Sequence, residues 1–256
     1  MKQVKIGKHN VTLYNSIDEL PIVRFHRYNK MLLIDAGLGS DLNAVDAHIE
    51  RAVRFINNDS RKDAATEMEN IRQTLFVIMQ EMNPKHLAFA CLVSEIDGEP
   101  CDDISDDGLR KTLQVLGDVP VKEMTAECEA VKKKIDEELS LYFPDEFDDA
   151  KEKEYYDIMK RRALAMLDAV IYGDTDERKA VIENLTDRLV CFYKPKTFTG
   201  KDSVEISMDR MFDEMCLMMG QHLTADPKKF TVMEYYNAYG YLKRSLRKQK
   251  RQIKAR

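Results

Sequence analysis

Residues 31–42 read MLLIDAGLGSDL and contain the pattern in this chain that most suggests cofactor chemistry. An apolar run ends at Asp35, and Gly37 and Gly39 follow it before a polar helix-start signal. A strand, a glycine loop and a helix N-terminus in this order can hold a phosphate or a carboxylate group of a cofactor. That chemistry requires residues 32–35 to form a parallel strand. It also requires a second strand about 20 residues later, with an acidic residue at its end.

The surrounding sequence favours a simpler interpretation of this loop. Residues 55–65 have no strand pattern, and the stretch after them has helical spacing. The segment GLGSDL also lacks the third glycine of a dinucleotide-binding loop. We therefore predict a joint between two helices, in which Gly37 or Gly39 adopts a positive φ and Ser40 or Asp41 caps the second helix.

Acidic, histidine and cysteine residues do not form a metal-binding or nucleophile pattern. The acidic cluster at 102–108 lacks the glutamate that an EF-hand needs at its twelfth position, so we expect a solvated loop with Ser105 as a helix cap. None of the five histidines lies three residues after a glutamate, which disfavours a carboxylate-bridged metal site. His48 and His86 are interpreted as core-edge or surface residues, and the apolar surroundings of Cys91 predict a buried thiol. We predict no catalytic, cofactor-binding or metal-binding residues.

The C-terminal segment from Phe230 onward is the most distinctive part of the sequence. Its apolar and aromatic residues fall on one face of a predicted helix. The last fourteen residues contain eight basic residues and no acidic one. We predict that this segment binds a partner through an aromatic face and an electrostatic end. The aromatic face comprises Tyr235, Tyr236, Tyr239 and Leu242; the electrostatic end comprises Lys243, Arg244, Arg247, Lys248, Lys250, Arg251, Lys254 and Arg256.

The same segment allows several partners. Eight charges of one sign can contact the phosphates of a nucleic acid or an acidic protein surface. They could also contact the acidic stretch at 145–154, within one subunit or between subunits. The tyrosines suit docking of the helix on its own domain or on a partner better than stacking on bases. A solvated helix end is the simplest alternative, because cations near a helix C-terminus are favourable.

Helical spacing dominates the rest of the chain. Residues 4–14 predict a β-hairpin around Gly7, the only clear sheet, and Ser16 begins a short predicted helix to Leu20. About nine helices follow, one of them from Pro84 to a stop at Gly98. We expect a mainly α, multi-helix bundle-like assembly with a small N-terminal hairpin. Two domains are predicted, at 1–118 and 119–256, with an acidic hinge near 145–154.

Composition places the chain among globular proteins. Its 256 residues are 44% apolar and 33% charged, which allows a sizeable core. The five cysteines lack paired spacing, which favours a reducing compartment. No apolar run approaches the roughly 18 residues that a membrane span needs, so we expect no membrane contact. These features predict a cytoplasmic location.

Two stretches resemble proteins of tailed bacteriophages that infect gut Bacteroidales. The first, LYNSIDELPIVRFHRYNKMLLIDAGLGSDL at 13–42, is similar to a recurring N-terminal signature. The second, KKFTVMEYYNAYGYLKRSLRK at 228–248, is similar to the aromatic-basic helix of some virion or tail-assembly proteins. Together they cover about a fifth of the chain. The resemblance implies a structural or assembly role, with the host cytoplasm or a virion as the location, and it carries over no functional residues.

Three functional hypotheses follow from the sequence. The first is a non-enzymatic interaction or assembly protein of a tailed phage, which binds other protein subunits as an oligomer or a member of a complex. The alternative is a helical nucleic-acid-binding protein that uses the basic C-terminal helix. The third is an enzyme that uses the loop at 35–41.

Overall fold

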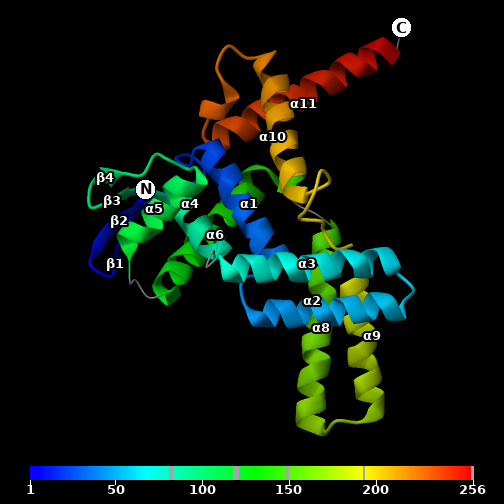
Figure 1. Ribbon diagram of the computed structural model, residues 1–256. Coiled ribbons are helices and arrows are strands. Elements are labelled where there is room, and N and C mark those ends of the chain that lie inside the picture. Colours follow the sequence, from blue (N-terminus) through cyan, green and yellow to red (C-terminus); the bar gives the residue numbers. More distant parts are fainter. Residues whose placement is uncertain (81–82, 118–120, 148–149, 193, 255–256) are drawn as a thin grey trace.

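The computed structural model describes residues 1–80, 83–117, 121–147, 150–192 and 194–254, and the protein is mainly α (Figure 1). In the described residues the helices are α1 (Ile22–Leu38), α2 (Leu42–Asn57), α3 (Arg61–Met79), α4 (Pro84–Leu92), α5 (Asp106–Leu116), α6 (Val121–Tyr142), α7 (Pro144–Phe147), α8 (Ala150–Tyr172), α9 (Asp176–Phe192), α10 (Val204–Gly220), the 3-10 helix η1 (Pro227–Lys229) and α11 (Val232–Lys254). The strands are β1 (Lys2–Ile6), β2 (His9–Leu13), β3 (Val93–Ile96) and β4 (Glu99–Pro100). The predicted fold class is confirmed.

The predicted hairpin belongs to a larger sheet than expected. β1 and β2 pair around Gly7, which has φ 58°, as the sequence predicts. The sheet continues in the order β1-β2-β3-β4, and every pair is antiparallel. β3 and β4 are joined by Asp97 and Gly98, whose positive φ values of 52° and 87° suit a two-residue hairpin turn. The predicted helix from Pro84 to Gly98 is therefore wrong beyond Leu92.

A buried arginine explains how α4 passes directly into β3. The last carbonyl groups of a helix have no partner inside the helix. Arg24, on α1, is 4% exposed, and its Nη1 donates to the carbonyl oxygens of Cys91 at 3.3 Å and Val93 at 2.9 Å. Its Nη2 donates to the carbonyl of Cys101. The Arg24 side chain thus donates to backbone carbonyl groups at the start of the β3–β4 hairpin and just after its end.

The two ends of the chain are tied together at the starts of α1 and α11. Pro21 and Thr231 form an isolated antiparallel bridge, in which the amide of Ile22 donates to the carbonyl of Phe230 at 2.8 Å. The amide of Val232 donates to the carbonyl of Leu20 at 2.9 Å. The predicted helix at 16–20 is instead a turn, and the Glu138 carboxylate of α6 accepts from its Ile17 amide at 2.9 Å.

One hydrophobic core crosses the predicted domain boundary near residue 118. It combines side chains from the sheet, α1 and α4 with side chains from α6, α10 and α11. Phe25, Tyr28, Phe89, Ile135 and Met219 are all at most 5% exposed in this core. Described residues on both sides of the predicted boundary therefore contribute to the same core.

The loop at 31–42 is a helix joint. Residues 32–35 lie inside α1 rather than in a strand, and Gly39 follows the helix with φ 71°. The Asp41 side chain accepts from the amide of Ala44 at 2.9 Å and caps α2. The prediction of a joint is confirmed, with Gly39 as the positive-φ residue and Asp41 as the cap. The parallel strand that a cofactor loop requires is replaced by helix.

Gly37 has a different role from Gly39, because it is helical and lies against an aromatic ring. A Cβ atom at Gly37 would lie 2.1 Å from Cζ of Phe198, which comes from the loop between α9 and α10. Phe198 is 7% exposed. The absence of a side chain at Gly37 is what lets this loop cross α1.

Replacing Gly37 by alanine is expected to displace Phe198 and to lower the free energy of unfolding by about 1–3 kcal/mol. Gly240→Ala is the matched control, because a Cβ there meets only Nη1 of Arg244 at 3.7 Å. This control should be neutral or up to about 1 kcal/mol stabilising, since alanine favours a helix interior. Urea unfolding followed by circular dichroism measures both. Equal stability of the Gly37 variant and the wild type would contradict the close approach.

Candidate interaction surfaces

The predicted aromatic face of the C-terminal helix packs inside the protein. Tyr235 and Leu242 are only 6% and 5% exposed, and both belong to the core. The Tyr236 ring lies 5.5 Å from that of Phe143 and 5.0 Å from that of Phe147, measured between ring centroids. Burial raises the pKa of Tyr236 to about 12. Tyr239 is partly buried against the same core. These residues dock α11 on its own chain, so Tyr235 and Leu242 present no surface to a partner.

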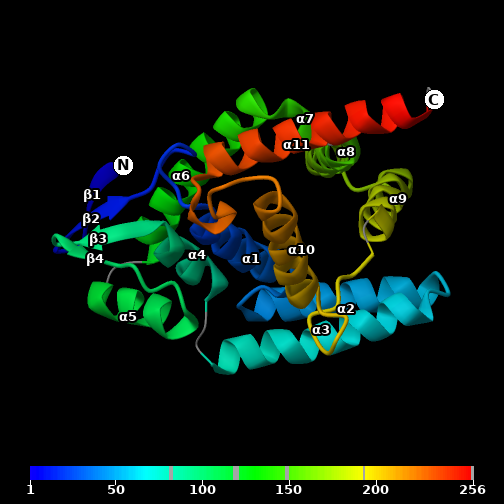
Figure 2. The same ribbon diagram turned by 90° about the horizontal axis from the view of Figure 1, so that it is seen from above.

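The basic end of α11 continues beyond this docked part. Figures 1 and 2 show the C-terminal half of the helix extending away from the body. Lys243 pairs with Glu146 of α7, which is one contact between the basic end and the acidic stretch at 145–154 within the same chain. Arg244 and Arg247 are exposed. Lys248, Lys250, Arg251 and Lys254 lie in the helix, and Arg256 lies outside the described residues. Partner binding by this end stays a prediction.

A second projecting element is formed by α8 and α9, which we call the helical arm. Figure 1 shows the two antiparallel helices extending from the body, on the opposite side from the end of α11. Arg54 of α2 joins the arm to the body, because its Nη1 lies 2.6 Å from both Glu183 Oε1 and Asp187 Oδ1 of α9. Between the two helices, Nε of Arg162 donates to Oγ1 of Thr186 at 2.8 Å.

The helical arm buries little apolar surface. Among its described residues only Ile158 and Leu185 are buried hydrophobic side chains. Many large apolar residues are exposed, with Val170 the most exposed at 83%. The others are Tyr156, Met159, Leu164, Met166, Leu167, Ile171, Tyr172 and Val181. These side chains stay exposed because a two-helix hairpin cannot cover the outer sides of its own helices. Exposed apolar residues that gather on one surface are typical of interaction sites.

One side of the arm is hollowed into a groove of about 600 Å³ between α8 and α9. Leu164 and Ala165 of α8 line it, together with Val181 of α9. Arg161 and Asp168 also line it, and they lie on either side of Leu164 and Ala165 along α8. The remaining lining residues are Ala180, Asn184 and Leu185. The groove therefore combines an apolar middle with one charge of each sign.

The α2–α3 hairpin is a second element with exposed apolar residues, but a buried polar network holds it together. The two helices lie side by side in Figure 1, and His48 and Glu67 between them are 1% and 3% exposed. Nδ1 of His48 lies 2.5 Å from Oε2 of Glu67, and Arg51 donates to Oε1 at 3.0 Å. Thr74 Oγ1 donates to the carbonyl of Leu38 at 2.7 Å, which ties the hairpin to the end of α1. The core-edge interpretation of His48 missed this network, because Glu67 lies 19 residues away on the next helix and the local sequence carries no sign of the contact.

A cleft of about 230 Å³ between α1, α3, α4 and α10 carries paired charges. Arg27 pairs with Asp106 across it. Lys30 Nζ lies 2.6 Å from Asp209 Oδ2 at its side. Burial raises the pKa of Glu205 at the same cleft. These ion pairs connect α5 and α10 to α1. Arg27 and Lys30 thus already have acidic partners within the chain.

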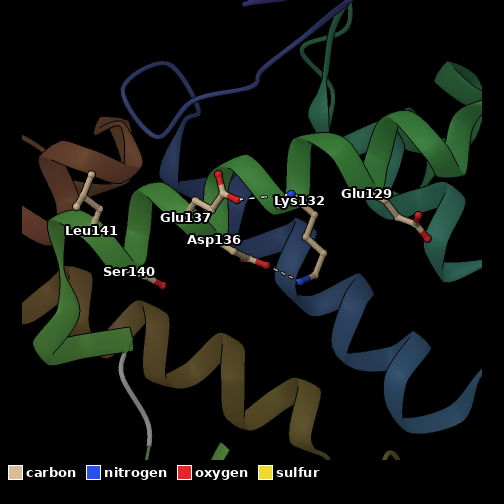
Figure 3. Close-up of a pocket in the computed structure, with 7 residues that line it drawn as sticks. Glu129, Lys132, Asp136, Glu137, Ser140 and Leu141 are labelled. Carbon is tan, nitrogen blue, oxygen red and sulfur yellow. Dashed lines mark hydrogen bonds and ion pairs between the residues drawn. The ribbon is translucent and has the colours of Figure 1, made fainter. Parts of the chain in front are cut away.

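The surface shown in Figure 3 is a polar strip of one helix. All of its lining residues come from α6, so no second element encloses them. Lys132 Nζ lies 2.5 Å from Asp136 Oδ2, and Lys133 Nζ lies 3.9 Å from Glu137 Oε1. Opposite charges four residues apart stabilise a helix surface by a few tenths of a kcal/mol. The strip is therefore a solvated helix face.

The other candidate sites of the sequence have structural roles. Ser105 caps α5 by accepting from the amide of Gly108 at 3.1 Å, which confirms the predicted cap. Cys91 is fully buried, and burial raises its pKa to about 12, as expected for a structural thiol. Within the described part of the chain, no group of three or more histidine, cysteine or acidic side chains is arranged to hold a metal ion. None of the described helices combines the length and apolar content needed to cross a bilayer.

Replacing Glu67 by alanine is expected to destabilise the protein by about 3–5 kcal/mol, because the buried His48 and the half-buried Arg51 lose their acidic partner. Glu69→Ala on the same helix is the control. Its pair with Arg72 is exposed, so it should change stability by less than about 1 kcal/mol. Thermal unfolding of both variants measures the difference. Similar losses of stability in the two variants would show that the buried network contributes no more than an exposed ion pair.

Comparison of the chain with known proteins gives no match to a protein-family model, a curated protein or a solved structure.

Proposed function

We propose that this protein is a non-enzymatic interaction protein that assembles with other protein subunits, as a structural or assembly component of a tailed phage. The observation that carries the interaction role is the helical arm, whose apolar residues project from the body without cover from any described element. Burying a single exposed side chain such as Val170 on a partner is worth about 1.5–3 kcal/mol. The phage context is supported by the resemblance of residues 13–42 and 228–248.

The arm supports assembly rather than catalysis for a physical reason. A binding site for a small molecule is concave and surrounds its ligand. The arm instead presents the outer sides of two projecting helices and an open groove between them. Surfaces of this shape suit another helix or sheet, which can cover several turns of the arm at once.

The proposal predicts that the exposed apolar residues of the arm bind phage proteins. The test is co-expression of the tagged chain with the structural proteins of the same phage genome, followed by co-purification. The double variant Leu167→Asp, Val170→Asp should reduce recovery of the partner at least about tenfold, because both side chains are exposed and would place charge in the interface. Val115→Asp, an exposed apolar site on α5, is the control. A wild-type chain that recovers none of these proteins contradicts the assembly role.

The alternative function is nucleic-acid binding by the basic end of α11. It is favoured by Arg244 and Arg247, which are exposed on the part of the helix that extends from the body. Phosphate contacts of such residues release counterions, so affinity falls steeply as salt rises.

Under this alternative, Arg244→Glu, Arg247→Glu should weaken binding to duplex DNA or RNA and reduce the salt slope by about 2, one unit for each lost phosphate contact. Lys5→Glu, Lys8→Glu is the control, because these lysines are exposed on the N-terminal hairpin. Fluorescence anisotropy at several salt concentrations measures both variants. An unchanged affinity and slope for the arginine variant would remove α11 as the nucleic-acid site.

A further inference from the structure

We propose that the groove of the helical arm binds the same groove of a second copy of this chain, so that two arms form an antiparallel four-helix bundle. This inference rests on the proposed function and names the partner of one side of the arm. A two-fold symmetric contact places the same patch on both subunits, so the patch must be complementary to itself.

The charges of the groove meet that requirement. Arg161 and Asp168 are seven residues apart on α8, which is two turns or about 10 Å along the helix. Leu164 and Ala165 lie midway between them, and both pairs share the same midpoint. If a two-fold axis passes through that midpoint and the helices run antiparallel, Arg161 of each copy faces Asp168 of the other. The two-fold symmetry then gives two ion pairs in total, one on each side of an apolar centre.

Among the described residues, Arg161 has an ion-pair partner in its own chain and Asp168 has none. Arg161 Nη2 lies 2.8 Å from Asp157 Oδ2, one turn earlier on the same exposed helix face. Asp168 makes no hydrogen bond or ion pair among the residues that the structure describes. The second copy would therefore supply a basic partner to an acidic side chain that has none in the described part of its own chain.

The side chains at the centre suit close packing of two helices. Leu164 is 52% exposed and Val181 is 52% exposed, and they flank the small residues Ala165 and Ala180. A large residue of one helix can then fill the space above a small residue of the other, as in the bundle packing of antiparallel helices. Four helices also give each arm helix a second neighbour, which covers the apolar side that the hairpin leaves exposed. Residues 150–192 contain eight basic and nine acidic residues, so two arms do not repel each other strongly.

The test is sedimentation velocity of the full chain from low micromolar to several hundred micromolar concentration. The wild type should form a dimer. Arg161→Asp and Asp168→Arg should each raise the dimer Kd at least about tenfold, because each reversal replaces two attractive contacts by two repulsive ones. The combined variant Arg161→Asp, Asp168→Arg should restore the Kd to within about threefold of the wild type, since it exchanges the signs and keeps the pairing.

Lys179→Asp is the matched control, because Lys179 is an exposed basic residue of α9 that does not line the groove. It should leave the dimer Kd unchanged. A wild-type monomer at every concentration, or single reversals without effect, overturns the self-pairing. Failure of the combined variant to restore the dimer, with its helical content intact by circular dichroism, overturns the register. If the wild type is a monomer but still recovers a phage protein in co-purification, the self-pairing is wrong and the proposed function is supported. If the wild type is a dimer but recovers no phage protein, the proposed function is wrong and the self-pairing is supported.

Discussion

Two antiparallel helices can bury only the side chains that lie between them, and this constraint shapes the whole molecule. Every other apolar side of a helical hairpin needs cover from a third element. The body meets the requirement by placing α1 among the sheet, α4, α6 and α11, so that residues such as Phe25 and Tyr28 are closed off from water. The helical arm does not meet it. Ile158 and Leu185 are its buried hydrophobic residues in the described chain, and the outer sides of both helices stay apolar and exposed.

The body is held by contacts between distant parts of the chain. The bridge between Pro21 and Thr231 fixes α1 beside α11. Arg24 satisfies the carbonyl groups where α4 becomes β3. Phe198 crosses α1 at Gly37 and positions the segment that leads from the arm to α10. These contacts are polar or close-packed and connect the elements of the body, from which the arm and the end of α11 project in different directions (Figure 1). The exposed apolar residues of the projecting arm are the basis of the proposed assembly role.

Local patterns were enough to predict most helices, because helical spacing, caps and breaks are written in neighbouring residues. Ser105, Asp41 and Gly39 end or begin their helices as their types suggest. β3 was missed because the apolar run through Cys91 continues without a break from helix into strand. The Asp97-Gly98 turn was the available signal for that hairpin. The aromatic face of α11 could be recognised from its spacing, whereas whether Tyr235 faces its own core or a partner depends on contacts with distant residues such as Phe212. The same holds for the groove, which exists only because α8 and α9 lie side by side.

In the proposed assembly role, the helical arm is incomplete alone and is covered by another molecule. Amide hydrogen exchange of the full chain at low and high protein concentration tests it most directly, because covering a helix slows the opening of its backbone hydrogen bonds. With Arg161, Leu164 and Asp168 at the pairing surface, the account predicts that protection of residues 158–185 rises with concentration while that of α1 and α4 stays constant. Exchange in the arm that is independent of concentration, and as slow as exchange in α1, would contradict the claim, because the arm would then be stable without any cover.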